Sequence, residues 1–199
     1  MVMSMIEVEK KFIGDNPDDV KRLLEGAEFM GEKTFADDYY DTDKLDLALK
    51  NIWLRSRDGK WELKFPYNYD AWHELETESE IADYLKLPKD ISLTQALENT
   101  GYKIFVPYTT TRKKYKKGEF TIDVDSLDFG YEMIEIELMV NDISEADEAV
   151  SKIIDFAKQY NLEVKSVRGK AQEYLLRHKK EHYDTLVKAG VITAQQAAA

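Results

Sequence analysis

The strongest constraint on the fold of this chain is an alternation of charged and apolar side chains that recurs in many short segments. In residues 6–12, IEVEKKF, one face carries Glu7, Glu9 and Lys11, and the other face is mostly apolar. A period of two residues is typical of a β-strand that rests one face on a core. A single strand of this kind is explained by a solvated polar face, so its meaning depends on what the other strands carry.

Eight segments follow this pattern, and turn residues separate several of them. The segments are residues 6–12, 34–42, 51–57, 60–66, 71–78, a part of 103–115, 120–126 and 133–140. Gly59, Gly118 and Gly130 predict tight turns between consecutive segments, so we expect most neighbours to pair antiparallel.

Helical periodicity occupies the regions between and after these segments. It predicts helices in residues 16–27, 79–87, 92–100, 144–160 and 171–190. Asn16 and the proline after it form a helix start signal, and Ser144 with Asp147 has the spacing of a capping box. We therefore predict an α+β fold, a closed eight-stranded antiparallel β-barrel with helices packed outside, with an open sheet as the alternative. Residues 1–199 would form a single domain that ends in a disordered tail.

The composition restricts the class of protein. The 199 residues carry a net charge of -11 and include no cysteine. The negative charge argues against general binding to nucleic acid, and the lack of cysteine excludes disulfides and cysteine metal sites. The first residues lack the apolar core of a signal peptide, and no segment has the length of a membrane helix. We expect a cytoplasmic monomer that binds neither nucleic acid nor a membrane.

The charged faces of the segments combine many carboxylates with several cations. They carry Arg55, Arg57, Glu62, Lys64, Glu74, Glu76, Asp123, Asp125, Glu135 and Glu137, and Arg112 lies within 103–115. If helices cover the apolar face, the charged face lines the barrel interior, where like charges need partners or a metal ion. Arginine and lysine bind phosphate oxygens, and carboxylates hold Mg²⁺. The pattern therefore favours a site for a polyphosphate with Mg²⁺ over a surface that is merely solvated.

Together these segments resemble the triphosphate tunnel metalloenzymes, the CYTH superfamily. The matching motifs, in order, are ExExK at residues 7–11, YYDT at 39–42, RSR at 55–57, ELK at 62–64, IDVD at 122–125 and EIE at 135–137. Within the superfamily, WLRSR, WELK, TIDVDSLDFGY and Lys170 before YLLR look most like the animal-type thiamine triphosphatases. The resemblance covers nearly the whole chain.

The resemblance implies a role for each matching residue. The triphosphate would be bound by Lys11, Arg55, Arg57, Lys64, Arg112, Asp123 and Lys170. The metal ion, Mg²⁺ or Mn²⁺, would be held by Glu7, Glu9, Asp123, Glu135 and Glu137. Trp53, on the face of the two arginines, and Tyr39 would flank the thiamine, because a cationic ring is attracted to aromatic faces. Asp125, Glu74 and Glu76 share the charged face without a defined role, and Glu62 would either join the site or pair with Arg57.

The implied reaction is metal-dependent hydrolysis of a triphosphate, most directly of thiamine triphosphate to thiamine diphosphate and phosphate. Hydrolysis of inorganic tripolyphosphate is the alternative, because residues 116–120, KKGEF, make a tighter turn than the longer loop of the mammalian enzymes. A non-catalytic polyphosphate- or nucleotide-binding module would need fewer metal ligands. No general base is evident, since His73 lies off the charged face by parity and His178 and His182 fall in the last predicted helix.

Overall fold

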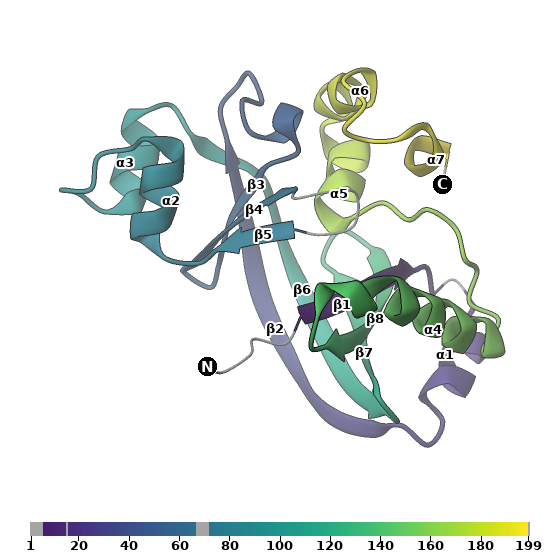
Figure 1. Ribbon diagram of the computed structural model, residues 1–199. Coiled ribbons are helices and arrows are strands. Elements are labelled where there is room, and N and C mark those ends of the chain that lie inside the picture. Colours follow the sequence, from purple (N-terminus) through teal and green to yellow (C-terminus); the bar gives the residue numbers. More distant parts are fainter. Residues whose placement is uncertain (1–5, 15, 67–71, 199) are drawn as a thin grey trace. The chain divides into compact units, whose positions relative to one another are not determined.

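The computed structural model describes residues 6–14, 16–66 and 72–198 and has an α+β fold (Figure 1). Eight strands form a sheet with the order β1-β8-β7-β6-β2-β3-β4-β5. The strands are β1 (Ile6–Phe12), β2 (Glu28–Asp41), β3 (Trp53–Arg57), β4 (Lys60–Pro66), β5 (Trp72–Leu75), β6 (Lys103–Lys117), β7 (Phe120–Leu127) and β8 (Tyr131–Val140).

The strand pairings confirm the antiparallel sheet of eight strands. Every pairing with a defined register is antiparallel. Strands β1 and β5 stand at the two ends of the order, and no pairing joins them within the part of the chain that the structure describes. Closure of the sheet into a barrel therefore stays a prediction.

Helices connect and follow the strands. The α-helices are α1 (Pro17–Leu24), α2 (Glu78–Leu85), α3 (Leu93–Asn99), α4 (Ala146–Gln159), α5 (Lys170–His178), α6 (Lys180–Lys188) and α7 (Ala194–Ala198). Two short 3₁₀ turns are η1 (Ala48–Lys50) and η2 (Ile143–Glu145). Among the described residues, no helix has both the length and the apolar character that a membrane crossing requires.

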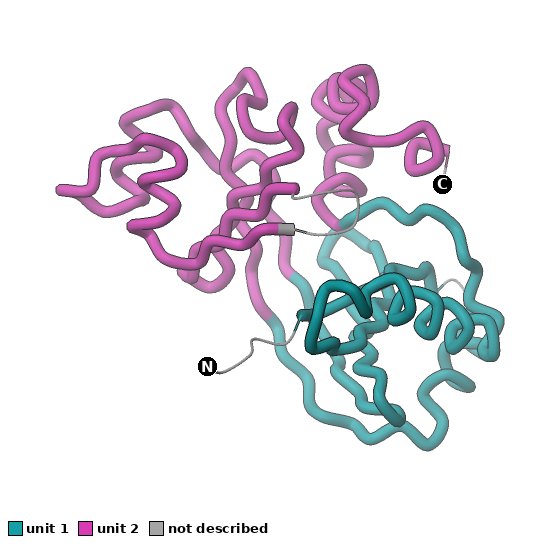
Figure 2. Tube along the Cα trace, viewed as in Figure 1, with its two compact units in different colours: residues 1–34, 110–169, 199 teal, residues 35–109, 170–198 magenta. Residues whose placement is uncertain are grey.

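The chain divides into two compact units (Figure 2). Unit 1 contains residues 1–34, 110–169 and 199, and unit 2 contains residues 35–109 and 170–198. The long strands β2 and β6 contribute to both units. Each unit has its own apolar core and its own charged face, so we describe them one at a time. The single domain expected from the sequence stays a prediction.

In unit 1, helices α4 and α1 pack on the apolar face of the sheet. Val8 of β1, Ile122 of β7 and Ile136 of β8 lie in one core with Ile153 of α4 and Leu23 of α1. Full burial of such a side chain stabilises the fold by about 1.5–3 kcal/mol. This core holds the apolar face of the strands on the helices, so the alternate residues of β1, β7 and β8 must form the other face.

In unit 2, helices α2 and α3 pack on the apolar face of the sheet. Leu54 of β3 and Leu63 of β4 lie in one core with Ile81 of α2 and with Leu93 and Leu97 of α3. Helices α2 and α3 therefore pack on the apolar face of unit 2, as predicted, and the charged side chains of β3 and β4 lie on the opposite face.

The predicted turns are confirmed. Asp58 and Gly59 have φ angles of 48° and 82° between β3 and β4. These left-handed values are the ones that a two-residue type I′ hairpin requires. Gly118 and Gly130 have φ angles of 60° and 77° in the turns before β7 and β8.

Strand β2 is longer than predicted. It begins at Glu28 rather than at Thr34. The sequence did not predict this first part of the strand, because residues 28–34 are mostly exposed and show no alternation of apolar and polar side chains.

Strand β5 is shorter than predicted, since its last residue is Leu75. Neither Glu76 nor Glu78 therefore continues its charged face, and Ala71 lies outside the described residues. Thr77 is instead the N-cap of α2, and its hydroxyl accepts a hydrogen bond from the backbone N–H of Glu80. The same hydroxyl donates to the carboxylate of Glu80 at 2.5 Å. A threonine at this position is a helix start signal that the sequence analysis did not use.

Two predictions for the helices are wrong. The capping box at Ser144 and Asp147 does not form, because Asp142 accepts from the backbone N–H of Ser144 in the turn η2 and α4 begins at Ala146. The helix expected in 171–190 is broken at Lys179, which has a φ angle of -140°, and no glycine or proline marks that break. The structure assigns the short helix α7 to Ala194–Ala198. The disordered tail expected from the sequence stays a prediction.

Candidate functional site

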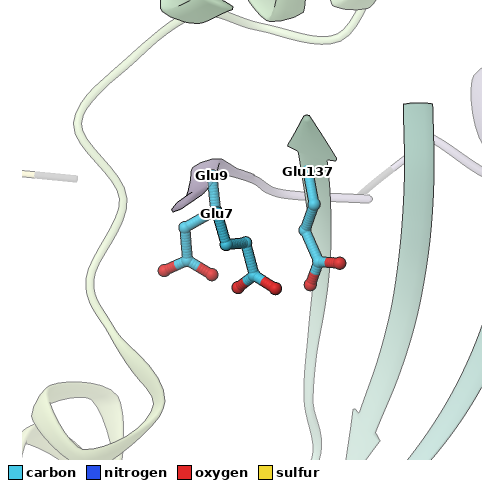
Figure 3. A group of neighbouring side chains, drawn as sticks. All are labelled: Glu7, Glu9 and Glu137. Atoms are coloured by element: carbon cyan, nitrogen blue, oxygen red, sulfur yellow. The ribbon is translucent and has the colours of Figure 1, made fainter. Parts of the chain in front are cut away.

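In unit 1, carboxylates from three neighbouring strands converge on the charged face. Glu7, Glu9 and Glu137 have carboxylate oxygens within 4.8 Å of one another, and all three side chains point to the same side (Figure 3). Asp123, Glu135 and Glu137 form a second group within the same distance. The register produces both groups, because Glu9 stands opposite Glu137 and Asp123 stands opposite Glu135. The structure thus brings together all five predicted metal ligands, and their role as ligands stays a prediction.

Arg112 lies among these carboxylates. Its Nε and Nη2 donate to the two oxygens of Asp125 at 2.8 and 2.7 Å, and its guanidinium also contacts Asp123 and Glu135. Such a fork arrangement fixes the guanidinium plane. Asp125, which had no defined role in our sequence analysis, therefore orients Arg112.

Two lysines complete the cations of this face. Lys11 contacts Glu9, and its Nζ lies 4.0 Å from Glu135. Lys114 was not predicted as a site residue, although it has the same parity on β6 as Arg112. Its Nζ lies 3.0 Å from Asp123 and 3.4 Å from Glu137.

The charged face of unit 1 is dense in carboxylates. Lys11, Arg112 and Lys114 lie among the carboxylates Glu7, Glu9, Asp123, Asp125, Glu135 and Glu137. Converging carboxylate oxygens are the donor set that Mg²⁺ or Mn²⁺ prefers. The residues of unit 1 therefore fit a hard divalent cation.

Burial and the neighbouring carboxylates shift the pKa of Glu137. Burial raises the pKa of its carboxyl group to about 8, and the negative charges of Asp123 and Glu7 add to the shift. A divalent cation would relieve this repulsion, because it favours the ionised carboxylate.

In unit 2, the charged face carries Arg55, Arg57 and Lys64, all predicted to bind phosphate. Arg55 donates from Nη2 to Glu62 at 2.8 Å, and the Nζ of Lys64 lies 2.6 Å from Glu74. Glu62 thus pairs with Arg55, its cross-strand neighbour, and not with Arg57 as we had considered.

Asp37 is a site residue that our sequence analysis missed. It is fully buried, and its two oxygens accept from Nε and Nη2 of Arg57 at 2.8 and 3.1 Å. The sequence signal was its parity with Tyr39 on β2. In unit 2 the carboxylates Asp37, Glu62 and Glu74 pair with Arg57, Arg55 and Lys64, in that order.

Aromatic side chains lie beside these arginines. Trp53 is half-buried, and its Nε1 donates to Asn51 at 2.9 Å. Tyr39 is buried and meets Trp53 edge to face, with ring centroids 6.1 Å apart. The hydroxyl of Tyr39 accepts from Arg55 at 3.4 Å and from Tyr108 at 3.3 Å. Because Tyr39 is buried, we expect Trp53 to contact a ligand ring and Tyr39 to support it.

The remaining predicted residues fall as follows. Lys170 is buried and is the first residue of α5, so it stands at the start of the C-terminal helical region, as the sequence predicted. His73 stacks on Phe65, and the ring of His178 lies 4.7 Å from that of Tyr174.

In each unit, helices pack on the apolar face of antiparallel strands, and acidic and basic side chains gather on the opposite face. The chain belongs to the CYTH domain family, whose model matches residues 5–170. This match confirms the superfamily that the motifs indicated.

Similar proteins support the same assignment. The thiamine-triphosphatases of Homo sapiens and Macaca fascicularis are each 29% identical to this chain over 211 residues, which cover 94% of this chain and 91% of each relative. A candidate adenylate cyclase of Methanocaldococcus jannaschii is 26% identical over 161 residues, or 79% of this chain and 91% of that protein. The structure of protein PH1819 of Pyrococcus horikoshii OT3 has a TM-score of 0.63 and 26% identity, and the match covers 87% of this chain and 99% of that chain.

The raised pKa of Glu137 predicts how stability depends on pH in the absence of metal. The folded state keeps the Glu137 proton up to a pH of about 8, whereas the unfolded chain loses it near the ordinary pKa of 4.5. This group therefore makes the free energy of unfolding fall as pH rises through that window. Since one pKa unit corresponds to about 1.4 kcal/mol, Glu137→Gln should remove on the order of 3 kcal/mol of the loss between about pH 5.5 and pH 8.

Urea unfolding in EDTA at the two pH values measures this effect. Glu132→Gln is the matched control, because Glu132 is an exposed glutamate on the same strand. If wild type, Glu137→Gln and Glu132→Gln lose equal stability over this range, Glu137 is not the perturbed group.

Proposed function

We propose that this protein hydrolyses the terminal phosphoanhydride bond of a triphosphate, with thiamine triphosphate as its substrate. The observation that carries the proposal is the convergence of carboxylate oxygens in unit 1, an arrangement that fits a divalent cation. Unit 2, taken by itself, presents two oriented arginines and a lysine. Membership of the CYTH family and the similarity to the human thiamine-triphosphatase support it.

The cations would bind and orient the substrate. In unit 2, Arg55, Arg57 and Lys64 are the proposed phosphate-binding residues. In unit 1, Lys11 and Arg112 have the same proposed role. Lys170 would add one further positive charge. Phosphoryl transfer needs little covalent help from the protein, so positioning and charge neutralisation account for most of the catalysis. No side chain is assigned as the general base.

The carboxylates of unit 1 would hold the metal ion. The proposed ligands are Glu7, Glu9, Asp123, Glu135 and Glu137, and the proposed ion is Mg²⁺, with Mn²⁺ as a substitute. A bound Mg²⁺ neutralises phosphate charge and polarises the phosphoryl oxygen. Asp125 would keep the guanidinium of Arg112 in place.

Trp53 supports thiamine triphosphate over other triphosphates. Its ring is half-buried, and contacts with Asn51 and Tyr39 hold it on the charged face beside Arg55. The thiazolium ring of thiamine carries a positive charge, which an indole face attracts. Inorganic tripolyphosphate has no ring and would not use this residue.

Inorganic tripolyphosphate is the second candidate substrate. The turn at Gly118 between β6 and β7 is tight, so no long loop is present there to contact a group beyond the phosphates. A binding module without turnover is less favoured, because binding alone does not require so many carboxylates. The cytoplasmic monomer expected from the sequence, without nucleic-acid or membrane partners, remains part of the proposal.

Phosphate release from thiamine triphosphate, tripolyphosphate and ATP tests the proposal. The three substrates are assayed side by side in Mg²⁺ and in EDTA. We expect release that depends on Mg²⁺ and is fastest with thiamine triphosphate. Fastest release from tripolyphosphate would retain a triphosphatase and reject the thiamine substrate. Tight binding without release would reject an enzyme, and release that survives EDTA would reject the metal site.

The Trp53→Ala variant tests the role of the indole. A cation–π contact contributes about 0.5–2 kcal/mol, so kcat/KM for thiamine triphosphate should fall by about 2- to 30-fold. The value for tripolyphosphate should stay near that of wild type. Tyr84→Ala is the control, because Tyr84 is an exposed aromatic residue of α2, on the helix-covered side of unit 2. An equal loss on both substrates would show that Trp53 serves packing alone.

A further inference from the structure

Two arginines of unit 2 are close enough to repel each other. Arg55 and Arg57 are two residues apart on the same face of β3, and their side chains are only 13% and 27% exposed. Two partly desolvated like charges are unfavourable unless a carboxylate lies nearby. The question is which group neutralises the pair and fixes its orientation before a substrate arrives.

Asp37 contacts both arginines. It stands opposite Arg57 in the register of β2 and β3. Its oxygens accept from Nε and Nη2 of Arg57 at 2.8 and 3.1 Å, and its Oδ1 lies 3.8 Å from Nη1 of Arg55. Glu62 holds Arg55 from the other neighbouring strand, β4.

Two neighbours fix the orientation of the Arg57 guanidinium plane. Asp37 occupies the edge that carries Nε and Nη2. The ring of Phe35 lies on the face, with its centroid 4.2 Å from Cζ of Arg57. A planar group held in two perpendicular directions has a defined orientation, and the Nη1 edge of Arg57 is turned away from Asp37.

Asp37 itself cannot reach a substrate from its position. Its side chain has no exposed surface. It also lies outside the two carboxylate groups that could hold a metal ion. Any effect of Asp37 on the reaction must therefore pass through the arginines that it contacts.

We propose that Asp37 is a positioning residue that presets Arg55 and Arg57 for the phosphoryl group in the transition state. This inference rests on the proposed triphosphatase function. Preorganised donors cost no rearrangement at the moment of reaction, which is why their orientation affects turnover more than ground-state binding.

The Asp37→Asn variant separates orientation from attraction. The amide keeps the size of the side chain, but its NH₂ group faces the Nη2 donor of Arg57 and breaks the fork. The loss of a negative charge makes the face more positive, so a triphosphate binds at least as well. We expect kcat for tripolyphosphate to fall by about 10- to 100-fold, the scale of a 1 Å misplacement, while KM stays equal or falls.

Two further variants make the test specific. Asp38→Asn is the matched control, because it removes the same charge from the next residue of β2, which is half-buried and points to the opposite face. Its kcat should equal that of wild type. Asp37→Glu keeps the charge but lengthens the side chain, so it should also lose turnover. Thermal unfolding curves check that each variant is folded.

The outcomes are distinguishable. Wild-type kcat in Asp37→Asn, or a rise in KM with kcat unchanged, overturns the positioning role. If Asp37→Asn does not fold, Asp37→Glu decides, and wild-type kcat in that variant overturns the role. No phosphate release by the wild-type protein from any triphosphate would reject the proposed function and this inference with it. Normal release by wild type and by both Asp37 variants would reject this inference alone.

Discussion

Pairs of opposite charges on neighbouring strands are the interactions on which the rest of the site depends. A buried carboxylate or guanidinium is costly unless a partner satisfies it, and residues directly opposite in an antiparallel pair are the nearest partners available. The register places a cation opposite a carboxylate in every one of these cases: Lys11 with Glu135, Arg112 with Asp125, Lys114 with Asp123, Arg57 with Asp37, Arg55 with Glu62, and Lys64 with Glu74.

The same register also builds the core, so fold and site share one determinant. A slip by one residue would move every apolar side chain to the charged face and every charged side chain to the helices. The two units differ in how the carboxylates of their charged faces are arranged. In unit 1 the carboxylate oxygens of Glu7, Glu9 and Glu137 converge within 4.8 Å of one another, whereas in unit 2 each of Arg55, Arg57 and Lys64 pairs with its own carboxylate. This difference explains why we assign the metal to unit 1 and why the arginines of unit 2 need a buried carboxylate to orient them.

Features that repeat along the sequence were predictable, and features set by single tertiary contacts were not. The two-residue period located all eight strands and placed Glu135 and Glu137 on the correct face, and the motifs identified the family. Parity could not reveal that Asp37, one of several acids in residues 36–46, is the one buried beneath an arginine. The break at Lys179 likewise has no local signal, and the first half of β2 is exposed enough to show no period. Closure of the barrel depends on pairing at the two ends of the sheet, which no periodicity reports.

The central claim, that the carboxylates of unit 1 form the metal site, is tested most directly by binding of Mn²⁺ measured by electron paramagnetic resonance. Glu9→Gln removes one carboxylate of unit 1 at an exposed position, so the variant should fold. Glu74→Gln makes the same change in unit 2. The account predicts that Mn²⁺ binds the wild-type protein, that Mg²⁺ displaces it, and that Glu9→Gln weakens binding while Glu74→Gln does not. Equal binding by wild type and Glu9→Gln, or a loss confined to Glu74→Gln, would contradict it.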